Sequence, residues 1–161
     1  MSDGPRFLAD AMLGRLARWL RLLGYDTAYD PGAADEELLH RALREGRVLL
    51  TGDGGISRRK SLRLLLLRQK TLEDQLRRVM AEFRLRPKEE LFFSRCPVCN
   101  EPLAPAPKEK LRERVPERVF ERQDDFYRCA ACEKIYWQGS HSRKVREFVK
   151  RLENEGGGEG R

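Results

Sequence analysis

The sequence predicts a three-layer α/β domain with a mainly parallel sheet, followed by a small cysteine-held module and a last helix. Two observations carry this prediction. Strand-like and helix-like apolar patterns alternate through residues 5–86, and four cysteines form two CxxC pairs within residues 91–154. Pro87 lies between these units, where aliphatic periodicity gives way to aromatic residues, prolines and cysteines. The glycine-rich tail, residues 155–161, is predicted to be disordered.

The first elements follow in order along the chain. Residues 6–10 are the first expected strand. Residues 12–23 place leucine and alanine side chains on one helical stripe, and Gly24 ends this helix. The next expected strand, residues 25–29, runs into a turn at residues 30–32.

The same alternation continues through the rest of the first unit. Residues 35–44 place apolar side chains on one helix face, and Gly46 closes this helix. Residues 48–51 are a buried strand, and the apolar run 62–67 is the fourth expected strand. A helix over residues 71–84 follows, with a threonine cap and an aspartate three positions later. Strands that alternate with helices predict a mainly parallel sheet.

The second unit is expected to be a ribbon held by one zinc ion. Two CxxC pairs present four thiolates to one tetrahedral Zn²⁺, which makes a closed, structural site. Redox chemistry is the alternative for a single pair, and the presence of two pairs argues against it. The 29 residues between the pairs exceed the usual ribbon spacing, so residues 102–116 are interpreted as a projecting insert and residues 142–154 as the last helix. The ligands are Cys96, Cys99, Cys129 and Cys132.

The charge of the chain suggests a polyanionic partner. The net charge is +7 and 25 of the 33 basic residues are arginine, whose planar guanidinium matches phosphate oxygens. An arginine-rich surface also arises in thermophiles and in GC-rich genomes, so composition alone leaves both interpretations open. The N-terminus is acidic and broken by proline, and the longest aliphatic run, residues 64–67, cannot span a bilayer. We therefore expect a cytoplasmic protein with no membrane partner, whose paired cysteines bind metal.

Carboxylates follow the expected strands where a parallel sheet places its ligands. Asp10 ends the first strand, Asp53 ends the third, and Asp35 opens the helix between them. Clustered carboxylates favour Mg²⁺ or Mn²⁺, and such a site suits hydrolysis of a phosphodiester. The alternative is structural: Asp10 and Asp35 as helix N-caps and Asp53 in an Asx turn. The glycines near Asp53 complete neither GxGxxG nor a P-loop, and no serine or cysteine nucleophile motif is present.

Several basic and aromatic residues are candidates for contact with nucleic acid. Three arginines lie on one arc of the first helix, a basic turn follows Asp53, and an aromatic residue and a histidine follow the second cysteine pair. The alternatives are a solvated arc, packing of Tyr136 and Trp137 in the ribbon core, and a structural histidine near the Ser142 cap. The candidates are Arg15, Arg18, Arg21, Arg58, Arg59, Lys60, Trp137 and His141.

Four segments carry a resemblance to a known family. FLADAMLGRLARWLRLLGYDT, DEELLHRALREGRVLLTGD, CPVCN and YWQGSH occur in this order, and together they resemble the Mut-seven C-terminal RNase-domain family over residues 6–145. The resemblance implies a PIN-like nuclease fold with a zinc ribbon, and a metal-dependent nuclease that acts on RNA. It places Asp10, Asp35 and Asp53 on the acidic positions of PIN-like sites. Relatives in the wider PIN-like group often carry an acidic residue where this chain has Gly55, which puts a two-metal site in doubt.

These observations together predict a divalent-metal-dependent endoribonuclease with a structural zinc ribbon that helps to bind RNA. Transfer RNA and ribosomal RNA are among the candidate substrates. The rival interpretation is a catalytically silent RNA-binding protein in which Gly55 marks a decayed site. A protein-interaction adaptor is a third class, and it predicts no salt-dependent affinity for nucleic acid.

Overall fold

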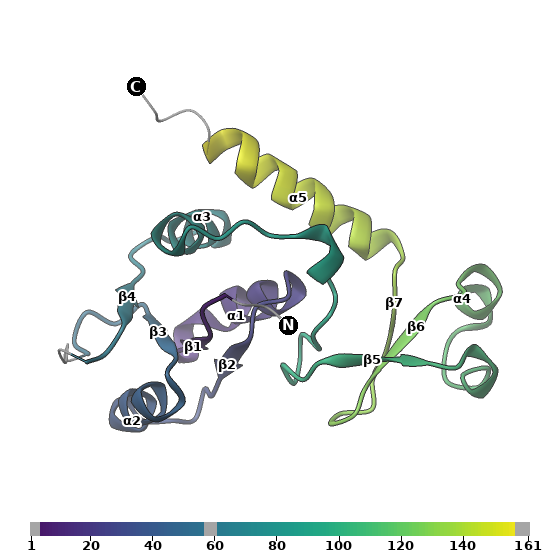
Figure 1. Cartoon of the computed structure of the whole chain (residues 1–161), viewed down its shortest axis with the longest axis horizontal. Coiled ribbons are helices and arrows are strands. Elements are labelled where there is room, and N and C mark those ends of the chain that lie inside the picture. The colour runs from purple at the N-terminus through teal and green to yellow at the C-terminus, as the bar shows by residue number, and fades with distance from the viewer. Residues whose placement is uncertain (1–3, 57–60, 157–161) are drawn as a thin grey trace.

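The computed structural model describes residues 4–56 and 61–156. Arg58, Arg59 and Lys60, which the sequence marks as candidates for nucleic-acid contact, lie outside the described residues, as do residues 157–161 of the tail. Figure 1 shows an α/β unit, a ribbon beside it, and a long last helix.

The α/β unit is built on a four-stranded sheet in which all paired strands are parallel. Its strands, in the spatial order β2-β1-β3-β4, are β1 (Phe7–Ala9), β2 (Thr27–Tyr29), β3 (Val48–Thr51) and β4 (Leu64–Leu66). The helices of the unit are η1 (Ala11–Leu13), α1 (Gly14–Leu22), α2 (Asp35–Glu45) and α3 (Leu72–Phe83). All four strands and all three α-helices lie where the sequence predicts them; β3 has the predicted bounds, and the others are shorter or longer by a few residues.

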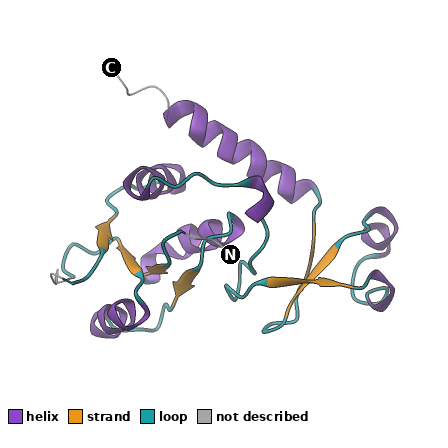
Figure 2. Cartoon of the chain, viewed as in Figure 1, coloured by secondary structure: helices purple, strands orange, loops and turns teal. Residues whose placement is uncertain are grey.

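The sheet is buried on both faces, which explains its near-continuous apolar strands. On one face, Phe7 and Leu50 pack with α1 and α3; on the other, Leu8 and Leu49 pack with α2. Successive strand residues point to opposite faces, so neighbours in the sequence enter different cores. The predicted α/β class with three layers and a parallel sheet is confirmed (Figure 2).

Gly24 ends α1 in a conformation that only glycine adopts easily. Its φ is +95°, and a Cβ built there would lie 2.6 Å from the carbonyl oxygen of Leu91. The chain that leads to the ribbon therefore approaches the backbone at the end of α1 directly.

The ribbon is a three-stranded antiparallel sheet in the order β5-β6-β7. The prediction of a projecting insert at residues 102–116 is wrong. Residues 103–106 form β5, which pairs with β6, and Leu111 and Val115 pack with Phe126 in a small core. Pro105 is tolerated because β5 is an edge strand, where one N–H is not needed for pairing. The elements of this part are η2 (Glu89–Leu91), β5 (Leu103–Ala106), η3 (Lys108–Lys110), α4 (Glu117–Arg122), β6 (Phe126–Cys129) and β7 (Ile135–Trp137).

The last helix, α5 (Ser140–Gly156), returns to the α/β unit. Its buried Val145, Val149 and Leu152 belong to the same core as α1 and α3, and Phe148 lies 4.4 Å from Trp19 between ring centroids. In Figure 1 it runs along the α/β unit, away from the ribbon strands. The division into residues 5–86 and 91–154 stays a prediction.

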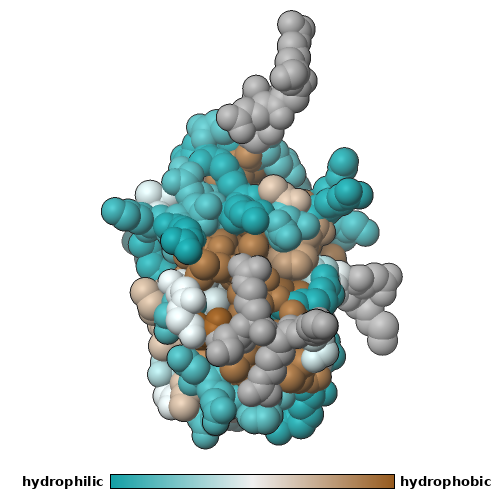
Figure 3. Space-filling model, turned by 90° about the vertical axis from the view of Figure 1, so that its left-hand side faces the viewer, coloured by the Kyte–Doolittle hydropathy of each residue, from teal (hydrophilic) through white to brown (hydrophobic). Residues whose placement is uncertain are grey.

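The edge strand β4 lies on a face with a concentration of apolar side chains. Leu64 and Leu66 are half-buried there, and Figure 3 shows apolar residues gathered in the middle of this face with hydrophilic residues above and below. Within residues 4–56 and 61–156, no helix has the length and apolarity needed to cross a membrane.

Candidate active site and metal centre

Asp10 is fixed at the carboxyl edge of the parallel sheet, between β1 and η1. Its side chain is only 5% exposed. Oδ1 accepts the N–H of Met12 at 3.0 Å, and Oδ2 accepts the hydroxyl of Thr51 at 2.6 Å and the N–H of Gly52 at 2.9 Å. These bonds join the ends of β1 and β3, which are neighbours in the sheet. Asp10 therefore caps η1, as the structural alternative expects, and also links two strand ends.

Asp53 lies just beyond the end of β3 and is exposed. Its Oδ1 accepts the N–H of Gly55 at 2.8 Å, the Asx turn that the structural alternative expects. A Cβ on Gly55 would come within 3.1 Å of this oxygen, so glycine gives the turn room.

Thr51 connects the two aspartates, and sequence reasoning did not single it out. Its fully buried hydroxyl donates to Asp10 and accepts the backbone N–H of Asp53 at 3.0 Å. A hydroxyl residue two positions before an aspartate at a strand end was the available signal.

Asp35 is the first residue of α2 and is exposed. The alternative in which Asp35 caps this helix is wrong. The N-cap residue is Ala34, whose N–H donates to the Glu37 carboxylate at 2.9 Å. This leaves the Asp35 carboxylate outside the capping interaction.

The structure brings the cysteines together but not the three aspartates. Within the described ranges, the four cysteines are the one group of three or more potential ligands whose ligand atoms all lie within 4.8 Å of one another. Asp10, Asp35 and Asp53 form no such group. Asp30 also lies at the carboxyl edge, just after β2, and binds the N–H of Gly32 at 3.1 Å. The sequence places Asp30 in a turn, although the strand-end rule applied to it as well.

The cysteine cluster has the composition of a closed metal site, and a metal such as zinc fits it. The Sγ atoms of Cys96 and Cys132 lie 3.7 Å apart. The hydroxyl of Tyr136 lies 3.1 Å from Cys96 Sγ. Burial alone raises the pKa of the Cys96 thiol, but hydrogen bonds from Tyr136 and from backbone N–H groups outweigh it and lower the pKa to about 7. Burial and the neighbouring sulfurs raise the pKa of Cys99 to about 12. Thiolates packed so closely would repel one another, and a bound cation would offset this repulsion.

One comparison with known proteins decides the family. The Mut7-C RNAse domain matches residues 5–149, which includes the sheet, the cysteine cluster and most of α5. The chain belongs to the Mut7-C RNase domain family. This membership indicates a nuclease-like function with an RNA substrate. No curated protein and no solved structure matches the chain.

The first cysteine knuckle of this Mut7-C domain is docked onto the α/β unit through Arg21. The Arg21 side chain is only 6% exposed, and its guanidinium donates to the carbonyl oxygens of Thr27, Pro97 and Val98 at 2.7, 3.1 and 3.0 Å. Burial lowers its pKa, against the attraction of the nearby cysteines and Asp26. The prediction that Arg21 shares an exposed arc with Arg15 and Arg18 is wrong, because α1 turns this position toward the ribbon.

The other arginines of the arc, and two residues near the ribbon, have different surroundings. Arg15 and Arg18 are exposed on α1. His141 is exposed in the first turn of α5, which begins at Ser140, before the expected residue 142. Ser142 is therefore inside the helix, and its hydroxyl donates to the carbonyl oxygen of Gly139 at 2.6 Å.

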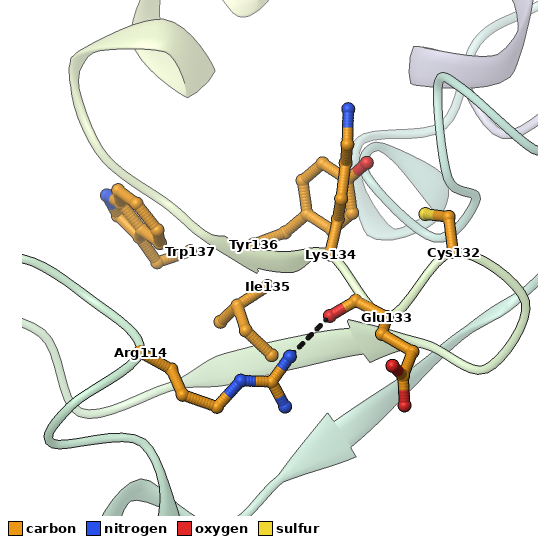
Figure 4. Close-up of a pocket in the computed structure, with 7 residues that line it drawn as sticks. All are labelled: Arg114, Cys132, Glu133, Lys134, Ile135, Tyr136 and Trp137. Atoms are coloured by element: carbon orange, nitrogen blue, oxygen red, sulfur yellow. Dashed lines mark hydrogen bonds between the residues drawn. The ribbon is translucent and has the colours of Figure 1, made fainter.

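The two aromatic residues of β7 contact different parts of the ribbon: Tyr136 contacts the cysteine cluster, and Trp137 contacts the small core. Trp137 packs against Phe126, with ring centroids 6.3 Å apart, and is half-buried. Figure 4 shows Tyr136 and Lys134 rising from one side of β7, with Ile135 extending from the other toward Arg114. Arg114 donates to the carbonyl oxygen of Glu133 at 3.0 Å. A surface hollow of about 530 Å³ lies here, so Trp137 contributes to the core and also faces the hollow.

Proposed function

We propose that this Mut7-C domain is a divalent-metal-dependent endoribonuclease that hydrolyses phosphodiester bonds of RNA. Asp10, Asp35 and Asp53 would bind Mg²⁺ or Mn²⁺, and the four cysteines would bind a structural zinc ion. The observation that carries the proposal is the RNase-domain match, together with Asp10 and Asp53 at adjacent strand ends joined through one threonine.

The oxygen donors at the sheet edge suit a hard cation. Mg²⁺ keeps several waters and needs only one or two protein carboxylates, so three aspartates spread along one edge are sufficient. Asp10 Oδ1 accepts a single hydrogen bond from the described residues and keeps a lone pair for a ligand. Asp35 and Asp53 are exposed and reach solvent without a change of fold.

The protein's own groups would hold the reacting atoms in place. A bound divalent cation would supply an activated water and neutralise charge on the scissile phosphate. Thr51 and the N–H groups of Met12 and Gly52 fix the Asp10 carboxylate in one orientation. The Asp53 carboxylate accepts the N–H of Gly55 in its own turn, and the backbone N–H of Asp53 donates to the same Thr51 hydroxyl. This preorganisation limits the motion of both carboxylates during the reaction.

The basic surface and the ribbon would bind the RNA chain. Arg15 and Arg18 are free to contact phosphates from α1. Trp137 and His141 would contact unpaired bases from the ribbon side. The zinc ion would have no open position for catalysis, because four thiolates complete its coordination.

Cleavage of end-labelled RNA tests this function. We expect cutting that requires Mg²⁺ or Mn²⁺ and falls about 100-fold or more in Asp53→Asn, because one carboxylate that would bind the cation is lost. RNA affinity should stay equal or rise, since a repelling charge is removed. Asp10→Asn should also abolish cutting. Asp124→Asn is the matched control: its carboxylate pairs with Lys108 on the ribbon surface and is 93% exposed.

The silent RNA-binding interpretation has two observations in its favour. Both oxygens of Asp10 already accept hydrogen bonds from the chain, and Gly55 offers no fourth carboxylate. Tight, salt-sensitive RNA binding without metal-dependent cutting would support this alternative and exclude the nuclease. Cutting that persists in both aspartate variants would also exclude the proposed site.

A further inference from the structure

A second hollow lies at the carboxyl edge of the sheet, beside Asp10. Its volume is about 530 Å³, within the range of small-ligand sites. We call it the edge hollow. Its lining consists of Met12, Leu13, Gly52, Leu67, Arg68, Gln69, Lys70 and Gln75. We propose that the edge hollow binds one unpaired RNA base next to the scissile phosphate. This inference rests on the proposed nuclease function and assigns it a single-stranded substrate.

The position of the edge hollow follows from hydrogen bonds already described. Met12 and Gly52 line it, and the N–H groups of these two residues donate to the two oxygens of Asp10. A ligand in the hollow would therefore contact residues that are themselves hydrogen-bonded to the Asp10 carboxylate. The hollow beside β7, which Arg114 and Trp137 line, has no comparable link to an aspartate among the residues that the structure describes.

The hollow has an apolar side that suits the flat face of a base. Met12 is 74% exposed and is one of two exposed large apolar side chains among the described residues. Its Sδ and Cε atoms lie 3.6 Å from the Cβ position of Gly52, so the thioether extends over the end of β3. Leu67 is buried beside it. A thioether contacts aromatic rings favourably, so the exposed Met12 side chain would pack against the face of a bound base.

Other residues of the lining are polar or positively charged. The side-chain oxygen of Gln69 is buried and has no hydrogen-bond partner among the described residues. Gln75 donates to the Gln69 carbonyl at 3.1 Å and so holds this loop in place. Arg68 and Lys70 are exposed, and the lining contains no carboxylate. On binding, the Gln69 side chain would turn so that its unpartnered oxygen accepts the amino or imino group of a base, while Arg68 and Lys70 contact phosphates.

This combination selects for an unpaired strand. In a duplex, base faces are stacked and the pairing edges are occupied, so neither Met12 nor Gln69 has a surface to contact. In a single strand, a base turns out of the stack and presents both its face and its edge. Phosphate contacts alone, by contrast, do not distinguish the two forms of RNA.

The three methionines provide a direct test, by NMR of protein labelled with ¹³C at the methionine methyl groups. Met12 is identified by the signal lost in Met12→Leu, and Met80, packed against the core, is the internal control. Oligouridylate is added without Mg²⁺ or Mn²⁺, so that no cleavage is required. We expect the Met12 signal to shift while Met80 does not, and no Met12 shift with the same strand annealed to oligoadenylate. Binding that leaves Met12 unmoved, or an equal shift with the duplex, would overturn the inference.

Affinity measurements provide the second arm of the test. Met12→Ala removes the thioether and keeps the backbone N–H that binds Asp10, and we expect affinity for oligouridylate to fall about fivefold with duplex affinity unchanged. Val98→Ala, at the other exposed large apolar side chain, is the control and should change neither affinity. Equal affinities for Met12→Ala and wild type would contradict the inference. A Met12 shift in a protein that never cuts RNA would support the base site and reject the nuclease. Cutting without a Met12 shift would support the nuclease and reject the base site.

Discussion

Asp26 shows how one side chain joins three parts of the chain. Its Oδ1 accepts hydrogen bonds from Arg47 at 2.7 Å and from Asn100 at 2.8 Å. Arg47 lies between α2 and β3 and also donates to the carbonyl oxygen of Phe7 at 3.1 Å, while Asn100 follows the first cysteine knuckle. Asn100 Oδ1 in turn accepts the N–H of Thr27 at 2.9 Å. This network satisfies the polar groups where the ribbon meets the sheet.

The charge of Asp26 predicts a pH dependence of stability. Burial alone would raise the pKa of Asp26, but the hydrogen bonds from Arg47 and Asn100 outweigh it, so the folded-state pKa lies below the ordinary value. The ionised carboxylate therefore stabilises the fold above the unfolded-state pKa of about 4, and this contribution is lost as the pH falls through the lowered value.

We expect Asp26→Asn to lower the free energy of unfolding at neutral pH by about 1–3 kcal/mol, and the difference from wild type to shrink below about pH 4. Urea unfolding of both proteins across this pH range measures it, with Asp124→Asn as the exposed control. A constant difference at all pH values would show that the charge of Asp26 is not the cause.

Among the elements, α5 contributes to the core of the α/β unit although it lies at the other end of the chain. It follows the ribbon in the sequence, yet its apolar stripe packs in the same core as α1 and α3. Ion pairs at its far end reinforce the packing, including Arg151 with Glu73 of α3 at 2.6 Å. The α/β core therefore includes residues that follow the whole ribbon in the sequence.

Removing one buried side chain from α5 tests this role. Leu152 is 2% exposed, and Leu152→Ala should cost about 2–5 kcal/mol because it leaves a cavity in the core. Lys150→Ala, at an exposed position of the same helix, should change stability by less than about 0.5 kcal/mol. Chemical denaturation measures both. A cost for Leu152→Ala no larger than the control would show that α5 contributes little to the core.

At the scale of the whole molecule, buried hydrogen bonds join the cysteine cluster to the α/β unit. The carbonyl groups of Pro97 and Val98, within the first CxxC pair, hold the buried Arg21 of α1. A metal ion bound to this knuckle would therefore also fix the two carbonyl groups that accept hydrogen bonds from the buried Arg21 guanidinium. Leaving Arg21 without these acceptors is costly, because its charge is removed from water.

We expect Cys99→Ser to lose bound zinc and to lower the melting temperature of the α/β unit as well as that of the ribbon. Metal analysis of the purified protein and thermal unfolding followed by circular dichroism measure the two effects. Val98→Ala, in the same knuckle, keeps the backbone carbonyl and all four thiols and should retain zinc. Zinc retained by Cys99→Ser at the wild-type ratio would refute the four-thiolate site.

The sequence predicts those features that depend on interactions between residues close together in the chain. The leucine stripe of α1, the Thr71 cap of α3 and the CxxC spacing each depend on neighbours within a few residues, so they are visible in the sequence. The strand-end rule also placed Asp10 and Asp53 at one edge of the sheet. The insert at residues 102–116 was misinterpreted, because its prolines concealed an edge strand and its scattered Leu111 and Val115 concealed a core.

The sequence by itself determined the parallel α/β order, the family and the four-cysteine ligand set, because periodicity and motif spacing are properties of short segments. Only the tertiary structure decided that Arg21 is buried against the first knuckle, that Thr51 joins Asp10 to Asp53, and that α5 belongs to the α/β core. Each of these depends on residues far apart in the chain. Helical spacing put Arg21 on the same arc as Arg15, and only the position of the ribbon distinguishes a buried arginine from an exposed one.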